Sequence, residues 1–135
     1  MYPNKTPYII LLLQCCLISV VMLSGCAAVR MHREMTQTRN LQIEEVDLQK
    51  VSDGSYTGSY SYAGFSYKVV VVVGAHRITQ INILQNRTTG KAKLAEDVIP
   101  AVVKEQKVNV DAHTGATSTS KALLKAVEDA LKNRQ

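Results

Sequence analysis

The residues best suited to chemistry form one short run, Asp111–Ser120, with the sequence DAHTGATSTS. It carries five hydroxyl side chains around a Gly-Ala pair and leads into a helical pattern that ends near Lys132. A helix begins with unpaired backbone N–H groups and the positive end of its dipole, which can hold a phosphate without lysine or arginine. Gly115 and Ala116 have little side-chain bulk, so a ligand can approach the backbone closely. The run therefore predicts a phosphate site, and its hydroxyls allow a covalent attachment.

This run resembles the flavinylation motif of FMN-binding domains, including the domain in the peripheral flavin subunit of the sodium-translocating NADH:quinone oxidoreductase. The family motif reads Asp, two variable residues, Ser or Thr, Gly, Ala, Thr, and its final Thr is esterified by the phosphate of FMN. The resemblance implies that Thr117 carries FMN through a phosphodiester, installed by a separate flavin transferase that uses FAD as donor. The matching positions are Asp111, Thr114, Gly115, Ala116 and Thr117, followed by Thr119 and Ser120.

The resemblance also implies roles for the residues around Thr117. Asp111 is expected to help the transferase recognise or activate the site. The hydroxyls expected to surround the phosphate are those of Thr114, Ser118, Thr119 and Ser120. A simpler interpretation is that one hydroxyl among residues 117–119 only caps the helix. Capping needs a single hydroxyl rather than a string of them, so we favour the flavin site.

A second loop, Asn86–Gly90, stands where the family often has the sequence Glu-Thr-Pro-Gly near the flavin. Thr88 and Gly90 match that sequence and are predicted to lie at the cofactor. Arg87 and Thr89 depart from it, so the carboxylate of the family is missing here. Further matches lie at Val46–Leu48 and Asp53–Gly58, and the resemblance covers Asp47 to Leu131.

The N-terminal residues form an export signal. Lys5 precedes an apolar run from Tyr8 to Leu23, and the sequence Leu-Ser-Gly-Cys at its end resembles the lipobox of bacterial lipoproteins. We therefore predict a signal peptide over residues 1–25, a lipid on Cys26 and a tether over residues 26–46. The alternative is an uncleaved anchor, because the apolar run is close to the roughly 18 to 20 residues that span a bilayer. In both cases the domain, residues 47–135, lies on the extracytoplasmic side of a bacterial membrane, in the periplasm or at the cell surface.

The remaining reactive residues argue against other classes of site. Cys15 and Cys16 lie in the predicted signal peptide and Cys26 is assigned to the lipid, which leaves no thiol for a disulfide or a metal. The three histidines lack ligand spacing and are interpreted as surface or loop residues, although His113 lies within the motif. The net charge is +5, and removing Lys5 with the signal peptide leaves +4. Without a basic stripe and interleaved aromatics, nucleic-acid binding is not expected.

The elements that must position these loops begin with a sheet. Residues 55–84 are strand-like, and Gly64 and Gly74 mark two turns, which predicts an antiparallel meander. The run Val69–Val73 has no polar alternation and predicts a central strand covered on both faces. We interpret the tyrosines of this region as cross-strand packing rather than as a stack on the flavin.

Helices follow the sheet. Residues 91–107 have helical spacing, and Pro100 either starts a second helical segment or kinks the first. The last helix has a packed face with Leu123, Val127, Ala130 and Leu131, and a solvent face with Lys121, Lys125, Glu128 and Asp129. The fold class is therefore α+β, an antiparallel sheet followed by helices, with the flavin loop at the N-terminus of the last helix.

Together these features predict a membrane-tethered, extracytoplasmic electron carrier with covalent FMN. Its expected partners are the flavin transferase and redox proteins in the membrane or outside the cytoplasm. A stand-alone enzyme is less supported, because no catalytic acid, substrate-binding arginine cluster or second redox centre is visible in so short a chain. The alternative is a lipoprotein that serves as a binding or assembly module of the same fold, with FMN held loosely or absent.

Overall fold

The computed structural model describes Gln14 and residues 27–132, and the chain divides into two compact units, Met1–Arg33 and Glu34–Gln135. In the first unit, residues 27–33 are helical and exposed. Cys26 and all of the predicted signal peptide except Gln14 lie outside the described residues, so the signal and the lipid stay predictions. Within the part of the chain that is described, no helix has both the length and the hydrophobicity that crossing a bilayer requires.

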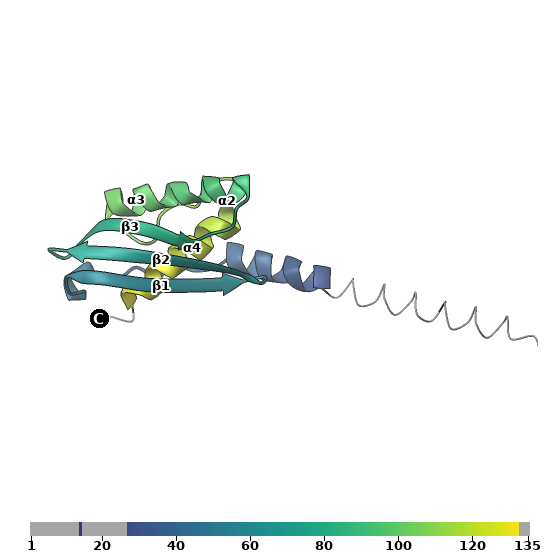
Figure 1. The fold of residues 1–135 in the computed structure, drawn as a ribbon, viewed down its shortest axis with the longest axis horizontal. Coiled ribbons are helices and arrows are strands. Elements are labelled where there is room, and N and C mark those ends of the chain that lie inside the picture. Colours follow the sequence, from purple (N-terminus) through teal and green to yellow (C-terminus); the bar gives the residue numbers. More distant parts are fainter. Residues whose placement is uncertain (1–13, 15–26, 133–135) are drawn as a thin grey trace, which may run out of the picture. The chain divides into compact units, whose positions relative to one another are not determined.

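The second unit is built on a three-stranded antiparallel meander, as predicted (Figure 1). Two-residue turns join the strands at Ala63–Gly64 and Ala75–His76, and the φ angles of all four turn residues are positive, from 50° to 76°. This is the geometry of type I′ turns, whose twist matches that of the strands. The strands, in sheet order, are β1 (Gly54–Tyr62), β2 (Phe65–Gly74) and β3 (Arg77–Gln85).

One long helix, α4 (Thr117–Lys132), packs across one face of the sheet (Figure 1). It crosses β1 so closely that a Cβ atom on Gly58 would lie 2.1 Å from the carbonyl oxygen of Ala126. The four apolar residues assigned to its packed face are all buried, which confirms that part of the pattern. The helix thus places its N-terminus, with Thr117, at one end of the sheet.

Glu128 lies on the packed side of α4 and not on the solvent face where the sequence placed it. Its carboxylate accepts hydrogen bonds from the backbone N–H of Glu44, at 3.1 Å, and from Nζ of Lys125, at 2.7 Å. A buried charge is tolerated when it is paired and hydrogen-bonded in this way. The helical pattern alone does not reveal this burial, because the N-terminal segment that covers Glu128 is remote in the sequence.

The central position of β2 is confirmed, but the expectation that both of its faces are covered is wrong. Val69, Val71 and Val73 are buried against the helices, whereas Val70 and Val72 are only half-buried. The pleat turns alternate residues to opposite faces, and those two valines pair with Thr57 and Ser55 on β1, which are exposed. The helices of the described residues therefore leave the outer face of the sheet open.

Three short helical segments link β3 to the loop before α4: α2 (Gly90–Leu94), η2 (Ala95–Asp97) and α3 (Val98–Glu105). Pro100 lies in the first turn of α3, so it belongs to the start of a separate segment rather than to a kink. At the end of α3, the Gln106 side chain accepts from the N–H of Ile78 and donates to its carbonyl, both at 2.8 Å. This pair occupies part of the free edge of β3.

The compact unit that contains the sheet begins at Glu34, ahead of residue 47, where the sequence placed the start of the domain. Residues 27–39 are helical, and η1 (Leu48–Lys50) precedes the sheet. Thr38, Ile43 and Val46 are buried, and Val46 and Ile43 belong to the main hydrophobic core. Much of the predicted tether is thus part of the folded unit. The apolar residues of this segment are widely spaced among polar ones, so the sequence pattern does not predict that the segment packs into the folded unit.

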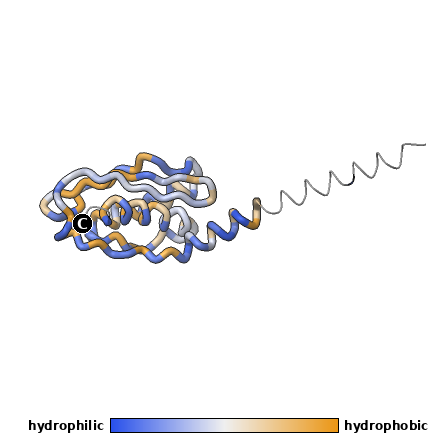
Figure 2. Tube along the Cα trace, turned by 90° about the horizontal axis from the view of Figure 1, so that it is seen from below, coloured by the Kyte–Doolittle hydropathy of each residue, from blue (hydrophilic) through white to orange (hydrophobic). Residues whose placement is uncertain are grey.

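Figure 2 shows the same arrangement by hydropathy. Hydrophobic residues gather along α4 and the strands that face it, while the residues of the N-terminal helix are mostly hydrophilic. The core therefore lies between the sheet and α4, and the loop before α4 is left at the rim of that core.

Candidate functional site

The loop before α4 is held in place by its own backbone and by one buried serine. Gly115 has φ of 85°, a left-handed conformation that glycine adopts without strain. The N–H of Ala116 donates to the carbonyl of His113 at 3.0 Å, and the N–H of His113 donates to the hydroxyl of Ser120 at 3.2 Å. Ser120 is fully buried, so it anchors the loop from beneath. These contacts fix the turn, and Thr117 follows it as the first residue of the helix.

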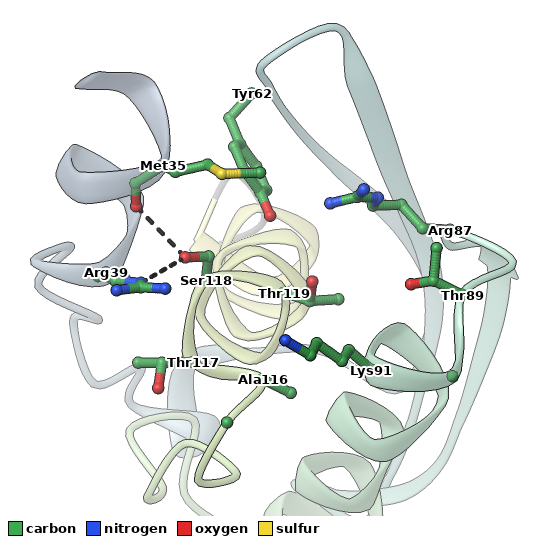
Figure 3. Close-up of a pocket in the computed structure, with 12 residues that line it drawn as sticks. Met35, Arg39, Tyr62, Arg87, Thr89, Lys91, Ala116, Thr117, Ser118 and Thr119 are labelled. Atoms are coloured by element: carbon green, nitrogen blue, oxygen red, sulfur yellow. Dashed lines mark hydrogen bonds between the residues drawn. The ribbon is translucent and has the colours of Figure 1, made fainter. Parts of the chain in front are cut away.

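A cleft of about 560 Å³ opens beside the start of α4 (Figure 3). Four parts of the chain that are far apart in sequence form its walls: the helix of residues 27–39, the end of β1, the segment after β3, and the loop before α4 with the first turn of that helix. Its lining residues are Met35, Arg39, Tyr62, Arg87, Thr89, Gly90, Lys91, Gly115, Ala116, Thr117, Ser118 and Thr119.

The cleft is positively charged. Arg39, Arg87 and Lys91 line it, and no carboxylate of the described residues does. The N-terminus of α4 adds the positive end of a 16-residue helix dipole. These charges surround a site that suits an anion, and a phosphate accepts hydrogen bonds from arginine and from backbone N–H groups alike.

Ser118 connects the two sides of the cleft. Nε of Arg39 donates to its hydroxyl oxygen at 3.2 Å, and that hydroxyl donates to the carbonyl of Met35 at 3.3 Å (Figure 3). The N-terminal helix is therefore joined to the first turn of α4 by side-chain hydrogen bonds, across more than 75 residues of sequence.

Two residues of the opposite wall, Tyr62 and Arg87, and the adjacent Tyr67 carry buried polar groups that lack a partner. Among the described residues, the buried hydroxyls of Tyr62 and Tyr67 and the buried Nε of Arg87 have no hydrogen-bond partner. The two tyrosine rings stack, with centroids 5.4 Å apart and planes within 3°, and the Arg87 guanidinium lies 3.9 Å from the centre of the Phe65 ring. Burial raises the pKa of the Tyr67 hydroxyl, and the neighbouring Tyr62 adds to this rise. Buried donors without partners are costly, so groups that line a cleft in this state point to a ligand.

Comparison with protein families matches residues 62–132 to the FMN-binding domain, and this stretch is more than half of the chain. The chain belongs to the FMN-binding domain family. It is also similar to a urocanate reductase of Eggerthella lenta, with 38% identity over 79 residues. Those residues make up 57% of this chain and 13% of that protein, so the similarity concerns a small part of a much longer polypeptide.

FMN is accordingly the cofactor of this domain, and the cleft beside α4 fits it. Its volume lies within the roughly 300 to 1,000 Å³ typical of small-molecule sites. FMN brings a dianionic phosphate for the cationic residues and the helix start, together with carbonyl and nitrogen acceptors for donors such as the Tyr62 hydroxyl and Nε of Arg87. The unpartnered donors are thus explained by a ligand of this chemistry.

The cleft is lined by six of the predicted site residues. These are Gly90, Gly115, Ala116, Thr117, Ser118 and Thr119. Thr88 lies in an adjoining groove that shares Arg87, Thr89 and Gly90 with the cleft. Asp111 and Thr114 are exposed and outside the cleft lining, while Ser120 is turned into the core. Ser120 therefore supports the loop and does not surround a phosphate directly.

Other residues that line the cleft were not predicted. Arg87 and Thr89 had been noted only as departures from the family sequence, and Tyr62 only as packing. Tyr67 is packing as interpreted, but Tyr62 both packs and lines the cleft. Lys91 carried no signal beyond its charge. Met35 and Arg39 fall in the predicted tether and are remote in sequence from every motif, so no sequence pattern pointed to them.

His113, the histidine of the motif, lies beside a carboxylate outside the cleft. Nδ1 of His113 lies 3.2 Å from the carboxylate of Asp97, outside the cleft lining, which agrees with the interpretation of His113 as a loop residue. Among the residues that the structure describes, no group of His, Cys, Asp and Glu is arranged to hold a metal ion.

Proposed function

We propose that this domain is an electron carrier with FMN linked covalently to Thr117, held at the extracytoplasmic face of a bacterial membrane. The observation that carries the covalent part is the place of Thr117 at the cleft, as the first residue of α4. Its half-buried hydroxyl makes no side-chain hydrogen bond within the described residues, whereas the hydroxyls of Ser118 and Ser120 are engaged. A phosphate on Thr117 would stand at the positive end of the helix dipole.

Attachment of FMN is a phosphoryl transfer without a change in redox state. The Thr117 oxygen forms a bond to the FMN phosphorus of FAD, the pyrophosphate bond of FAD breaks, AMP leaves and the hydroxyl loses its proton. Among the described residues, the cleft lining contains no carboxylate or histidine to act as a base, which supports the proposal of a separate transferase. Asp111 is exposed and near the site in sequence, so we assign it to recognition by that transferase.

When bound, FMN supplies one- or two-electron redox chemistry, and the residues of this chain hold it and bias its potential. Arg39, Arg87 and Lys91 place positive charge in the cleft, which favours negatively charged forms of the cofactor. Tyr62 offers a donor hydroxyl, and Gly90 and Gly115 leave room for close approach to the backbone. The described residues that line the cleft include no carboxylate or histidine, and we favour a carrier over an enzyme.

Membrane attachment is proposed from the lipobox that ends at Cys26 and from the apolar run before it. A covalent cofactor suits an exported protein, because a dissociated flavin is lost to the surroundings. The similarity to a small part of a urocanate reductase supports a role in passing electrons to a separate catalytic module, in the membrane or outside the cytoplasm.

The intact mass of the chain, exported in a host with and without a flavin transferase, tests the attachment. We expect a transferase-dependent gain of one FMN less one water, mapped to the peptide that contains Thr117. Thr117→Ala abolishes the gain, and the matched variant Thr57→Ala, at an exposed position on β1 outside the cleft lining and outside the motif, keeps it. Covalent flavin in Thr117→Ala would move the attachment elsewhere. A folded chain without any gain would favour the alternative, a module that holds FMN loosely.

A further inference from the structure

Arg39 lies outside the part of the chain that matches the FMN-binding family, since the match begins at residue 62. It is nevertheless a wall of the cleft, together with Met35 from the same helix. Both residues belong to the compact unit that starts at Glu34. The segment that the sequence assigned to a tether thus contributes directly to the cofactor site.

The position of Arg39 differs from that of the other two cations. Its Nε donates to the hydroxyl of Ser118, the residue that follows Thr117. Arg87 and Lys91 come from the loop after β3 and the start of α2, and Figure 3 draws them across the start of α4 from Arg39. Arg39 is therefore the cation tied by a hydrogen bond to the turn that carries the predicted attachment point.

The remaining donors of Arg39 are suited to a phosphate. A guanidinium has five N–H donors in a planar fork, and the bond to Ser118 uses one of them. Ser118 in turn bonds the carbonyl of Met35, which holds the helix and the guanidinium in one place. Arginine preorganised in this way binds phosphate oxygens with charge-assisted hydrogen bonds.

We propose that Arg39 binds the phosphate of FMN, which makes the segment with Met35 and Arg39 part of the cofactor site. This inference rests on the proposed function in one respect, that the phosphate lies at the start of α4. It assigns to Arg39 the discrimination between FMN and flavins that lack a phosphate.

The test compares FMN with riboflavin, which has the same ring and side chain without the phosphate. Both are titrated into the exported chain carrying Thr117→Ala, so that binding is reversible and independent of any transferase. Flavin fluorescence quenching gives the two affinities. Adding Arg39→Gln is expected to lower the affinity for FMN by about tenfold or more, which corresponds to one charge-assisted hydrogen bond. The affinity for riboflavin is expected to stay unchanged. Arg39→Lys keeps the positive charge but not the planar fork of donors. Its affinity for FMN is expected to lie between those of the Thr117→Ala parent and the Arg39→Gln variant.

Arg77→Gln is the matched control, because Arg77 is an exposed arginine at the opposite end of the sheet from Tyr62. It is expected to change neither affinity. An equal loss of FMN and riboflavin in Arg39→Gln would overturn the inference, since it would make Arg39 a structural residue only. No preference for FMN in the Thr117→Ala parent would overturn it as well. Both outcomes are separate from the mass measurement, which alone decides whether the attachment is covalent.

Discussion

At the scale of residues, the hydroxyls of Tyr62 and Tyr56 form a matched pair. The first is expected to affect FMN affinity and the second the stability of the fold. The buried Tyr62 hydroxyl lines the cleft without a partner, whereas the Tyr56 hydroxyl donates to the carbonyl of Ser52 at 2.7 Å. Tyr62→Phe removes a buried hydroxyl that has no hydrogen-bond partner of normal geometry among the described residues, so the free energy of unfolding without FMN is expected to stay the same or rise slightly. Its affinity for free FMN, measured in the Thr117→Ala background, is expected to fall about three- to tenfold.

Tyr56→Phe is the matched variant with the opposite expected result. It removes one hydrogen bond, which costs about 0.5 to 1 kcal/mol of stability, and leaves FMN affinity unchanged. A loss of stability in Tyr62→Phe with no effect on FMN would show that its hydroxyl serves the fold. Urea denaturation and flavin titration on both variants give the comparison.

At the scale of elements, the crossing of β1 and α4 depends on Gly58. A Cβ atom there would lie 2.1 Å from the carbonyl oxygen of Ala126 and 2.3 Å from the backbone nitrogen of Ala130. These are backbone atoms that cannot rotate away, so Gly58→Ala must separate the strand from the helix. We expect a loss of about 3 kcal/mol or more in the free energy of unfolding, measured by urea denaturation. Gly74→Ala is the control, because its Cβ would meet only the Thr79 side chain, at 3.4 Å.

The turn between β2 and β3 gives the fold a dependence on pH. Backbone N–H groups of Ala75 and then His76 hydrogen-bond the Asp53 carboxylate and lower its pKa below 3.8. Because the folded pKa is the lower one, this stabilisation is present above pH 3.8 and is lost as the pH falls through the folded value. In Asp53→Asn the carboxylate is absent, so the loss of stability between neutral pH and a pH below 3.8 is expected to be smaller than in the parent. Urea midpoints at the two pH values measure it, and an equal loss in both proteins would contradict the role of Asp53.

At the scale of the whole molecule, membrane attachment and cofactor attachment are expected to be separable. Cys26→Ala removes the predicted lipid site, so the chain should no longer incorporate a radiolabelled lipid precursor. Cys16→Ala lies within the predicted signal peptide and is expected to keep the label. Thr117→Ala is expected to keep the lipid and lose the flavin. Labelling of Cys26→Ala would contradict the lipobox assignment.

The local parts of the fold and of the site could be predicted because their causes are local. Strand propensity and glycine-marked turns define the meander, and helical spacing of apolar residues defines α4. The hydroxyl run at the start of that helix identified the family and five neighbouring residues of the cleft lining, Gly115 to Thr119, because these residues are adjacent in sequence. The same reasoning misplaced Glu128 and the outer face of β2, because burial depends on which segment returns to cover a surface.

The sequence by itself determined the order of strands and helices, the loop that opens α4 and the membership of the FMN-binding family. Only the tertiary structure decided that Arg39 and Met35 form a wall of the cleft, that Ser120 faces the core, and that the folded unit begins at Glu34. Helix periodicity and turn geometry act over a few residues and are written in the local sequence. The contact of Arg39 with Ser118 joins residues 79 positions apart, and packing of the whole chain is what brings such residues together.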